Sequence, residues 1–194
     1  MNSWRSLRRV ALAACIMGCF AAVSSMAEAT IARALELSRL VATSTSIVLA
    51  QPVSARSTWE TLGPSRRIVT YTRVRVAESV VGEAQPGAEL VIRTLGGRVG
   101  DIAQTVGGEA SLREEDPALL FLTPERTSTS LWQLVGMSQG YYPVKLDPDG
   151  TPRVHVGSQH LQLLGPAHSA AEQIVGLELS QAIALIRSGR SAAR

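Results

Sequence analysis

The sequence offers little for thiol or disulfide chemistry. Of its 194 residues only two are cysteines, Cys15 and Cys19, and both lie near the N-terminus. A form of the chain without this region has no disulfide, so its fold must be held together by its core. The remaining ~165 residues suffice for one domain that buries roughly 70% of its unfolded surface.

Aromatic residues and lysine are also scarce. Aromatic residues make up 4% of the sequence, and Lys145 is the only lysine among 19 basic residues. Platforms that bind single-stranded nucleic acid combine basic grooves with stacking aromatic side chains. Here Arg73, Arg75 and Arg93 predict only a basic stripe on neighbouring strands, which we interpret as a solvated outer face. We therefore expect no nucleic-acid partner.

The N-terminal 29 residues have the organisation of a secretory signal peptide. Three arginines precede an apolar run at 10–23, and small residues at Ala27 and Ala29 mark a cleavage site. The run is too short for a bilayer span, which needs about 20 residues. We expect export to the periplasm or beyond, a mature chain starting near Thr30, and no transmembrane span. Cleavage removes three arginines and one glutamate and lowers the formal charge from +3 to +1.

Lipid anchoring is the alternative fate of this leader. Cys15 and Cys19 each follow a stretch that resembles a lipobox. Cys15 has almost no apolar run ahead of it, and Met17 stands where a small residue is usual before Cys19. We therefore favour cleavage after Ala29.

The least ordinary segment is the glycine-rich stretch 96–108, which holds five glycines in thirteen residues. It lies between two strand-like runs, 89–95 and 117–122. Glycine between strands usually marks a bulge or a sharp bend. We expect this stretch at the corner where one half of a β-barrel turns into the other.

Apolar patterning predicts seven or so short strands. The clearest is 67–80, in which side chains alternate between two faces. One face holds Ile68, Thr70, Thr72, Val74 and Val76. Further strands are expected at 46–53, 90–95, 118–123, 130–136, 141–146 and 151–156. Turns are expected at 63–65 and 147–150, and Pro52, which lacks an N–H, predicts a bulge or an edge.

Helical spacing of apolar residues predicts a helix at 31–42 and another from Leu179 to Ile186, with Gly189 just past its last turn. Residues 157–176 are expected to be irregular. The fold class is therefore mainly β: a small antiparallel OB-like β-barrel with a short helix at each end, forming one domain over 30–194.

Residues 136–140 match the G-x-S-x-G pattern of serine hydrolases, with Ser138 as the nucleophile. Acid and base candidates follow in the usual order: Asp147 or Asp149, then His155, His160 or His168. However, Pro143 disfavours the helix that should follow, and no parallel βαβ unit is visible. We interpret the segment as a turn between strands and keep a hydrolase using Ser138 as the alternative.

No metal or cofactor site is expected. The spacing of His155, His160 and His168 does not match zinc-ligand spacing. The turn 147–150 lacks the later ligands of a calcium loop, where Ser158 replaces the glutamate. The glycine-rich stretch has neither the lysine nor the following helix of a phosphate-binding P-loop.

Several of these motifs occur together, in this order, in a family of uncharacterised exported bacterial proteins that the chain resembles. The family signature is G-G-x-V-G-x-I-x-Q-x-V-x-G, then L-L-F-L and G-x-x-Q-G, matched here at 96–108, 119–122 and 136–140. The resemblance covers about residues 35 to 145. Because the family has no known activity, it implies export and a barrel, with a structural role for G-x-x-Q-G.

The order of a helix, an Ile-Val segment and a long strand is more distantly similar to the netrin-like barrel of tissue metalloprotease inhibitors, which has the OB fold. Those inhibitors bind catalytic zinc through an N-terminal cysteine, which a chain starting at Thr30 lacks. This similarity implies a further alternative, a partner or inhibitor of an exported protease.

The absence of an intact catalytic constellation favours an exported, non-catalytic binding module. Its expected partner is another exported or envelope protein. Loops carry function more often than strands, so we expect the binding surface at the glycine-rich stretch and at the segment after Gly136. The candidate residues are Gly96, Gly97, Gly100, Gln104, Gln139 and Tyr141.

Overall fold

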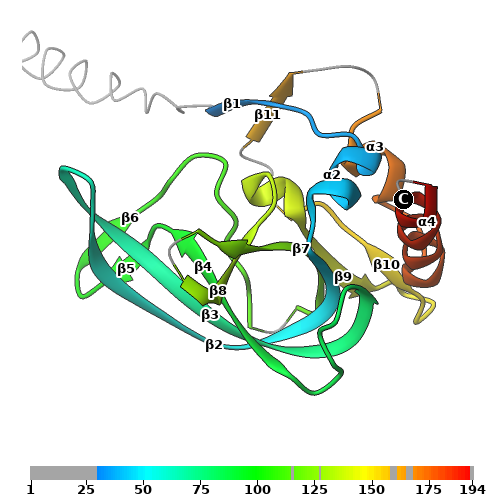
Figure 1. Ribbon diagram of the computed structural model, residues 1–194, viewed down its shortest axis with the longest axis horizontal. Helices are drawn as coiled ribbons and strands as arrows, with labels where there is room; N and C mark the ends of the chain where they lie inside the picture. Colours follow the sequence, from blue (N-terminus) through cyan, green and yellow to red (C-terminus); the bar gives the residue numbers. More distant parts are fainter. Residues whose placement is uncertain (1–29, 115, 127, 158–160, 165–167, 193–194) are drawn as a thin grey trace, which may run out of the picture.

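The computed structural model is mainly β, with short helices near both ends of the described chain (Figure 1). It describes residues 30–114, 116–126, 128–157, 161–164 and 168–192. The expected signal peptide, both cysteines, Ser158 and His160 lie outside these residues. Within the described residues, no helix has the length and apolar character needed to cross a membrane.

Seven strands form one mixed sheet. They are β2 (Ser46–Leu62), β3 (Ser65–Val81), β4 (Glu89–Leu95), β7 (Ala118–Glu125), β8 (Ser128–Leu134), β9 (Tyr141–Leu146) and β10 (Pro152–Val154). Their order is β10-β9-β7-β2-β3-β4-β8, and β7 also pairs with β8. The five strands β7, β2, β3, β4 and β8 thus follow one another in a partial ring, hereafter the ring.

The predicted antiparallel arrangement is wrong at one pair of strands in the ring. β8 runs parallel to β4, and only two residue pairs join them, through Val91 and Ile92. The reason is topological: β7 crosses back to pair with β2, and the hairpin that follows returns β8 to the free edge of β4. The other pairings within the seven-stranded sheet are antiparallel.

The hairpin of β2 and β3 is much longer on its β2 side than the sequence predicts. The turn at Gly63 and Pro64 is confirmed, and a register shift after Pro52 confirms the predicted bulge. Beyond Val53 the sequence of β2 is polar and lacks apolar alternation, so a strand end was expected there. Pairing with β3 nevertheless continues to Leu62, and the far half of the hairpin extends away from the helices (Figure 1).

The glycine-rich stretch is more than a corner. Its first part forms a separate two-stranded hairpin, β5 (Gly97–Val99) and β6 (Ile102–Gln104), which turns at Gly100. A loop, described over residues 105–114, then leads toward β7. The stretch therefore joins β4 to β7 through an added layer beside the long hairpin (Figure 1).

Three predictions near the chain ends are wrong. The expected helix at 31–42 begins as a strand, β1 (Thr30–Arg33), and turns helical only in α2 (Leu37–Thr43). The segment predicted as irregular contains β11 (Leu161–Leu164), which pairs in parallel with β1, and α3 (Ala170–Ile174). The last helix, α4 (Leu179–Ala192), runs through Gly189 instead of ending there.

Two apolar clusters lie on opposite sides of the sheet. Outside the ring, α2, α3 and α4 pack on the sheet through a cluster that includes Leu40, Phe121 and Ile186. Inside the ring, Val48, Val76 and residues of β7 form a second cluster. Neighbouring residues of β2 point to different clusters, so the unbroken apolar run that begins β2 is covered on both faces.

Candidate functional site

The inner face of the ring changes from apolar to hydroxyl-bearing along β3. Val76 and Val74 are buried in the inner cluster, and Thr72 and Thr70 follow on the same face because alternate residues of a strand share a face. Thr70 is paired with Ser57 on β2 and with Thr94 on β4. One end of the ring is therefore lined by hydroxyl groups from three adjacent strands.

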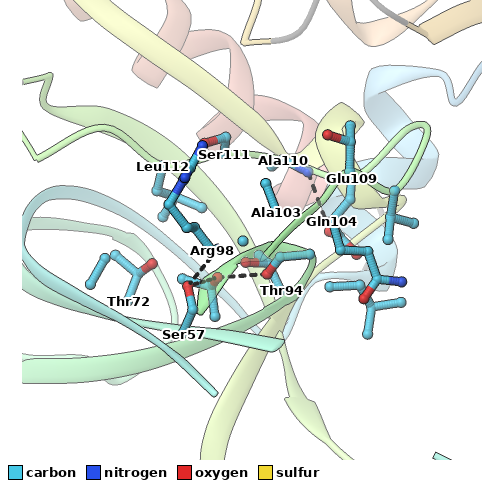
Figure 2. Close-up of a pocket in the computed structure, with 17 residues that line it drawn as sticks. Ser57, Thr72, Thr94, Arg98, Ala103, Gln104, Glu109, Ala110, Ser111 and Leu112 are labelled. Atoms are coloured by element: carbon cyan, nitrogen blue, oxygen red, sulfur yellow. Dashed lines mark hydrogen bonds between the residues drawn. The ribbon is translucent and has the colours of Figure 1, made fainter. Parts of the chain in front are cut away.

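A cavity of about 390 Å³ lies between these hydroxyl groups and the loop that follows β6. In Figure 2, Ala110 and Leu112 of the loop face Thr72 and Ser57 of the strands. Ala110 and Leu112 are buried and belong to the inner cluster, so they separate the cavity from the apolar interior. We call this space the ring-end cavity.

We call the hydroxyl groups of Ser57, Thr70 and Thr94 the hydroxyl row. The β5–β6 hairpin adjoins the cavity because its Gly97 lies against the Ser57 and Thr70 side chains of this row. Its backbone φ is +129°, and a Cβ there would overlap the hydroxyl oxygens of Thr70 and Ser57. The Thr70 hydroxyl donates to the Gly96 carbonyl at 2.7 Å and lies 2.9 Å from the Ser57 hydroxyl. Glycine is thus required here for close approach.

Thr72, Thr94 and Glu109 supply further polar groups to the cavity. Both threonines are buried. Burial raises the pKa of the Glu109 carboxyl, while backbone N–H groups of Leu95 and Ala110 favour its ionised form. The Ala110 N–H donates to Glu109 Oε1 at 3.3 Å. The cavity thus combines hydroxyl groups with one carboxyl whose proton is held more tightly than usual.

The structure brings together three of the six predicted site residues. Gly96, Gly97 and Gln104 line the ring-end cavity. Gly100 lies at the tip of the β5–β6 hairpin, with open space around it. Tyr141 is buried in the inner cluster and also lines a second, charged groove nearby.

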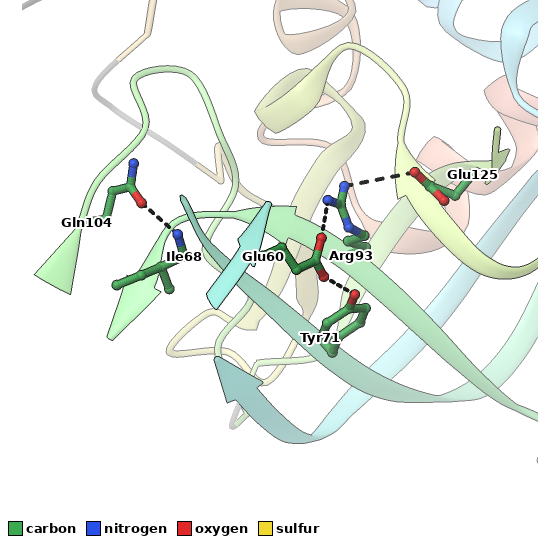
Figure 3. A network of polar contacts seen from close by, with 6 residues as sticks. All are labelled: Glu60, Ile68, Tyr71, Arg93, Gln104 and Glu125. Carbon is green, nitrogen blue, oxygen red and sulfur yellow. Dashed lines mark hydrogen bonds and ion pairs between the residues drawn. The ribbon is translucent and has the colours of Figure 1, made fainter. Parts of the chain in front are cut away.

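Both predicted glutamines use their side chains within the protein. Gln104 Oε1 accepts the Ile68 backbone N–H at 2.7 Å and ties β6 to β3 (Figure 3). Gln139 Oε1 accepts the Leu35 N–H at 2.8 Å, and its Nε2 donates to the Arg33 carbonyl at 3.1 Å. Gln139 thus fixes the chain between β1 and α2.

Replacing Gln139 by alanine should release this N-terminal segment. Two backbone groups lose their partner, so we expect the free energy of unfolding to fall by about 1–2 kcal/mol. Hydrogen exchange at the Leu35 amide should accelerate by more than that at Leu40. The matched control, Gln85→Ala, removes an exposed glutamine and should change neither quantity. Equal changes in stability and in hydrogen exchange for the two variants would contradict the role of Gln139 in fixing the chain between β1 and α2.

Ser138 lies in a short 3-10 helix, Met137–Gly140, between β8 and β9. The residue is 6% exposed, and its backbone N–H donates to the Gly108 carbonyl at 3.0 Å. Within the described residues, no hydrogen bond joins its hydroxyl to a histidine or an aspartate. The segment connects two strands, as expected of a turn.

A polar network on the outer face of the ring holds Arg93 (Figure 3). Arg93 pairs with Glu60 at 2.6 Å and with Glu125 at 3.9 Å, and Tyr71 donates its hydroxyl to Glu60. The hydrogen bond from Arg93 is the main cause that lowers the pKa of Glu60. Arg93 is only 15% exposed, so the predicted solvated outer face is wrong for this residue.

Across the described part of the chain, no group of three or more histidine, cysteine, aspartate or glutamate side chains is arranged to hold a metal ion. Comparison with known proteins adds no assignment: no protein-family model matches the sequence, and no curated protein matches it significantly. The ring-end cavity and the groove beside it are therefore judged on their chemistry alone.

Sequence reasoning missed the residues that define the ring-end cavity. Thr70 and Thr72 were placed on one face of the predicted strand, but nothing in the pattern separated them from a structural threonine. Thr94 and Glu109 reach the cavity only through strand pairing and the loop after β6. An alternating strand whose inner face turns from valine to threonine was the available indication.

Proposed function

We propose that this protein is a non-catalytic binding module and that the ring-end cavity holds a small polar ligand. The observation that carries the proposal is the hydroxyl row inside the ring, where apolar side chains would be expected. A ligand with several hydrogen-bonding groups would meet the side chains of Thr72, Thr94 and Glu109, which line the cavity. Its volume of about 390 Å³ lies within the size range of ligand pockets.

We also propose that the ring is an OB-like barrel. Support comes from the strand order β7-β2-β3-β4-β8, the additional pairing of β8 with β7, and the parallel β4–β8 pair. A five-stranded, partly open Greek-key barrel has this kind of architecture. The proposal concerns shape only, because one fold supports many functions.

Thr94 provides the sharpest test of the cavity. Thr94→Leu should place a larger, apolar side chain in the cavity and abolish binding. Thr94→Val keeps the side-chain volume, removes one hydroxyl and should weaken binding about tenfold. The probes are a panel of sugars, polyols and amino acids, and the readout is the amide NMR shifts of Gly96 and Gly97. Thermal unfolding of each variant checks that the fold is retained. A probe bound equally well by Thr94→Leu would place the site elsewhere.

The protein partner expected from the sequence is retained as a proposal in a narrower form. Such a partner would insert a polar side chain into the ring-end cavity, and Thr94→Leu would then prevent capture of the partner. Export, with lipid anchoring as the alternative, remains a proposal that rests on the N-terminal sequence alone. The hydrolase and protease-inhibitor alternatives gain no support from the geometry around Ser138 or from the described N-terminal residues.

A further inference from the structure

A second groove, of about 620 Å³, lies on the other side of the loop that covers the ring-end cavity. The groove has three walls, which are formed by the loop, by β9 and by residues 155–157. Glu109 lines both spaces, so the loop separates them. In this groove, charged side chains lie next to the backbone of glycine residues.

The groove is lined by two cationic side chains, Arg113 and Lys145, and by the carboxyl groups of Glu109 and Asp116. Arg113 is exposed and forms no ion pair within the described chain. Lys145 is 50% exposed, and its 3.9 Å pair with Asp116 is loose. The Glu109 carboxyl accepts the Ala110 backbone N–H, and Asp116 pairs with Lys145, so Arg113 is the cation of the groove that has no ion pair among the described residues.

His155, which lines the groove, has a side-chain nitrogen without a hydrogen-bond partner among the described residues. This nitrogen, Nε2, is buried. The backbone of His155 is fixed, because its N–H donates to the Pro143 carbonyl at 2.8 Å. Buried polar atoms in proteins are nearly always partnered. Because Nε2 has almost no accessible surface, the imidazole ring would have to turn toward the groove for this atom to meet a ligand oxygen.

Three glycines line the groove. Gly107 and Gly108 present bare backbone on the loop side. Gly157 lies so close to Tyr141 that a Cβ would overlap the Tyr141 ring and carbonyl oxygen. The charged side chains that line the groove are those of Glu109, Arg113, Asp116 and Lys145.

We propose that this groove binds a small molecule bearing an oxyanion, either a carboxylate or a phosphate-type group, between Arg113 and Lys145. Arginine and lysine form charge-assisted hydrogen bonds with such oxygens, which are about twice as strong as neutral ones. The site is distinct from the ring-end cavity and does not depend on the function proposed for that cavity.

The test is a titration of the purified protein with sulfate, inorganic phosphate and succinate. The amide NMR shifts of Gly107, Gly108 and Gly157 are expected to saturate with at least one of these ions. Arg113→Gln and Lys145→Gln should each weaken binding about fivefold or more. The matched control is Arg56→Gln, which removes an exposed arginine of the long hairpin outside the groove and should leave the affinity unchanged.

The three ions distinguish the possible sources of the oxyanion. Tighter binding of succinate assigns the site to carboxylic acids, and tighter binding of sulfate or phosphate assigns it to phosphate-type groups. The absence of a saturable shift with all three ions would overturn the proposal. Equal weakening by Arg56→Gln and Arg113→Gln would also overturn it, because the effect would then be general charge screening.

Discussion

Replacing Gly97 by valine is expected to lower the free energy of unfolding by about 3 kcal/mol or more. Two effects add. The backbone φ of +129° is strained for any residue with a Cβ, and the new side chain would overlap the hydroxyl groups of Thr70 and Ser57. The β5–β6 hairpin must therefore lift from the ring. Urea denaturation followed by circular dichroism measures the loss.

Gly100→Ala is the matched control for this prediction. Gly100 also has a positive φ, +59°, but no atom lies within 4 Å of a Cβ built there. Its cost should be the backbone strain alone, about 1–2 kcal/mol. A Gly97→Val loss no larger than that of Gly100→Ala would contradict the seating of the hairpin on the hydroxyl row.

Replacing Arg93 by methionine should cost about 2 kcal/mol at neutral pH. Removing one partner of a buried ion pair costs about 3–5 kcal/mol, and the partial exposure of this network reduces that value. The variant leaves the Glu60 and Glu125 carboxylates, both largely covered, without their shared cation. Chemical denaturation of the two proteins gives the difference.

Arg75→Met is the control, because the Arg75 side chain is 61% exposed and pairs with Glu89 on the protein surface. Exposed pairs contribute between about zero and 1 kcal/mol. An equal loss in the two variants would show that burial of the Arg93 network is not what stabilises it.

The same network predicts a pH dependence. The pKa of Glu60 is lowered in the folded state, chiefly by the hydrogen bond from Arg93. A carboxyl with a lowered folded pKa adds stability above its ordinary pKa near 4.5, and this stability is lost as the pH falls through the folded pKa. Arg93→Met should therefore lose less stability than the wild type on acidification below pH 4.5.

Local sequence patterns predicted well those strands that bury apolar side chains on one or both faces. The alternation in β3 and the apolar runs of β7 and β9 are properties of neighbouring residues, as is the turn after Leu146. The far half of β2 could not be predicted in this way, because it is held by cross-strand pairing with β3 and not by apolar burial. The same holds for β1 and β11, which pair across more than a hundred residues.

Glycine density drew attention to Gly96 and Gly97, which line the ring-end cavity. At Gly97 the close approach to Thr70 and Ser57 requires glycine. Gln104 and Gln139 were predicted to bind a partner, yet each bonds the backbone of this chain. A sequence does not distinguish a glutamine that caps an internal N–H from one that faces a ligand.

The most direct test of the binding function is native mass spectrometry of the protein isolated from the producing cell, compared with Thr94→Leu purified in the same way. The account predicts that the wild type carries a small polar molecule at one per chain and that Thr94→Leu carries none. If both proteins carry the same molecule, the ring-end cavity is not the binding site. If the wild type carries no molecule even after incubation with an excess of cell extract, the proposed binding function is contradicted.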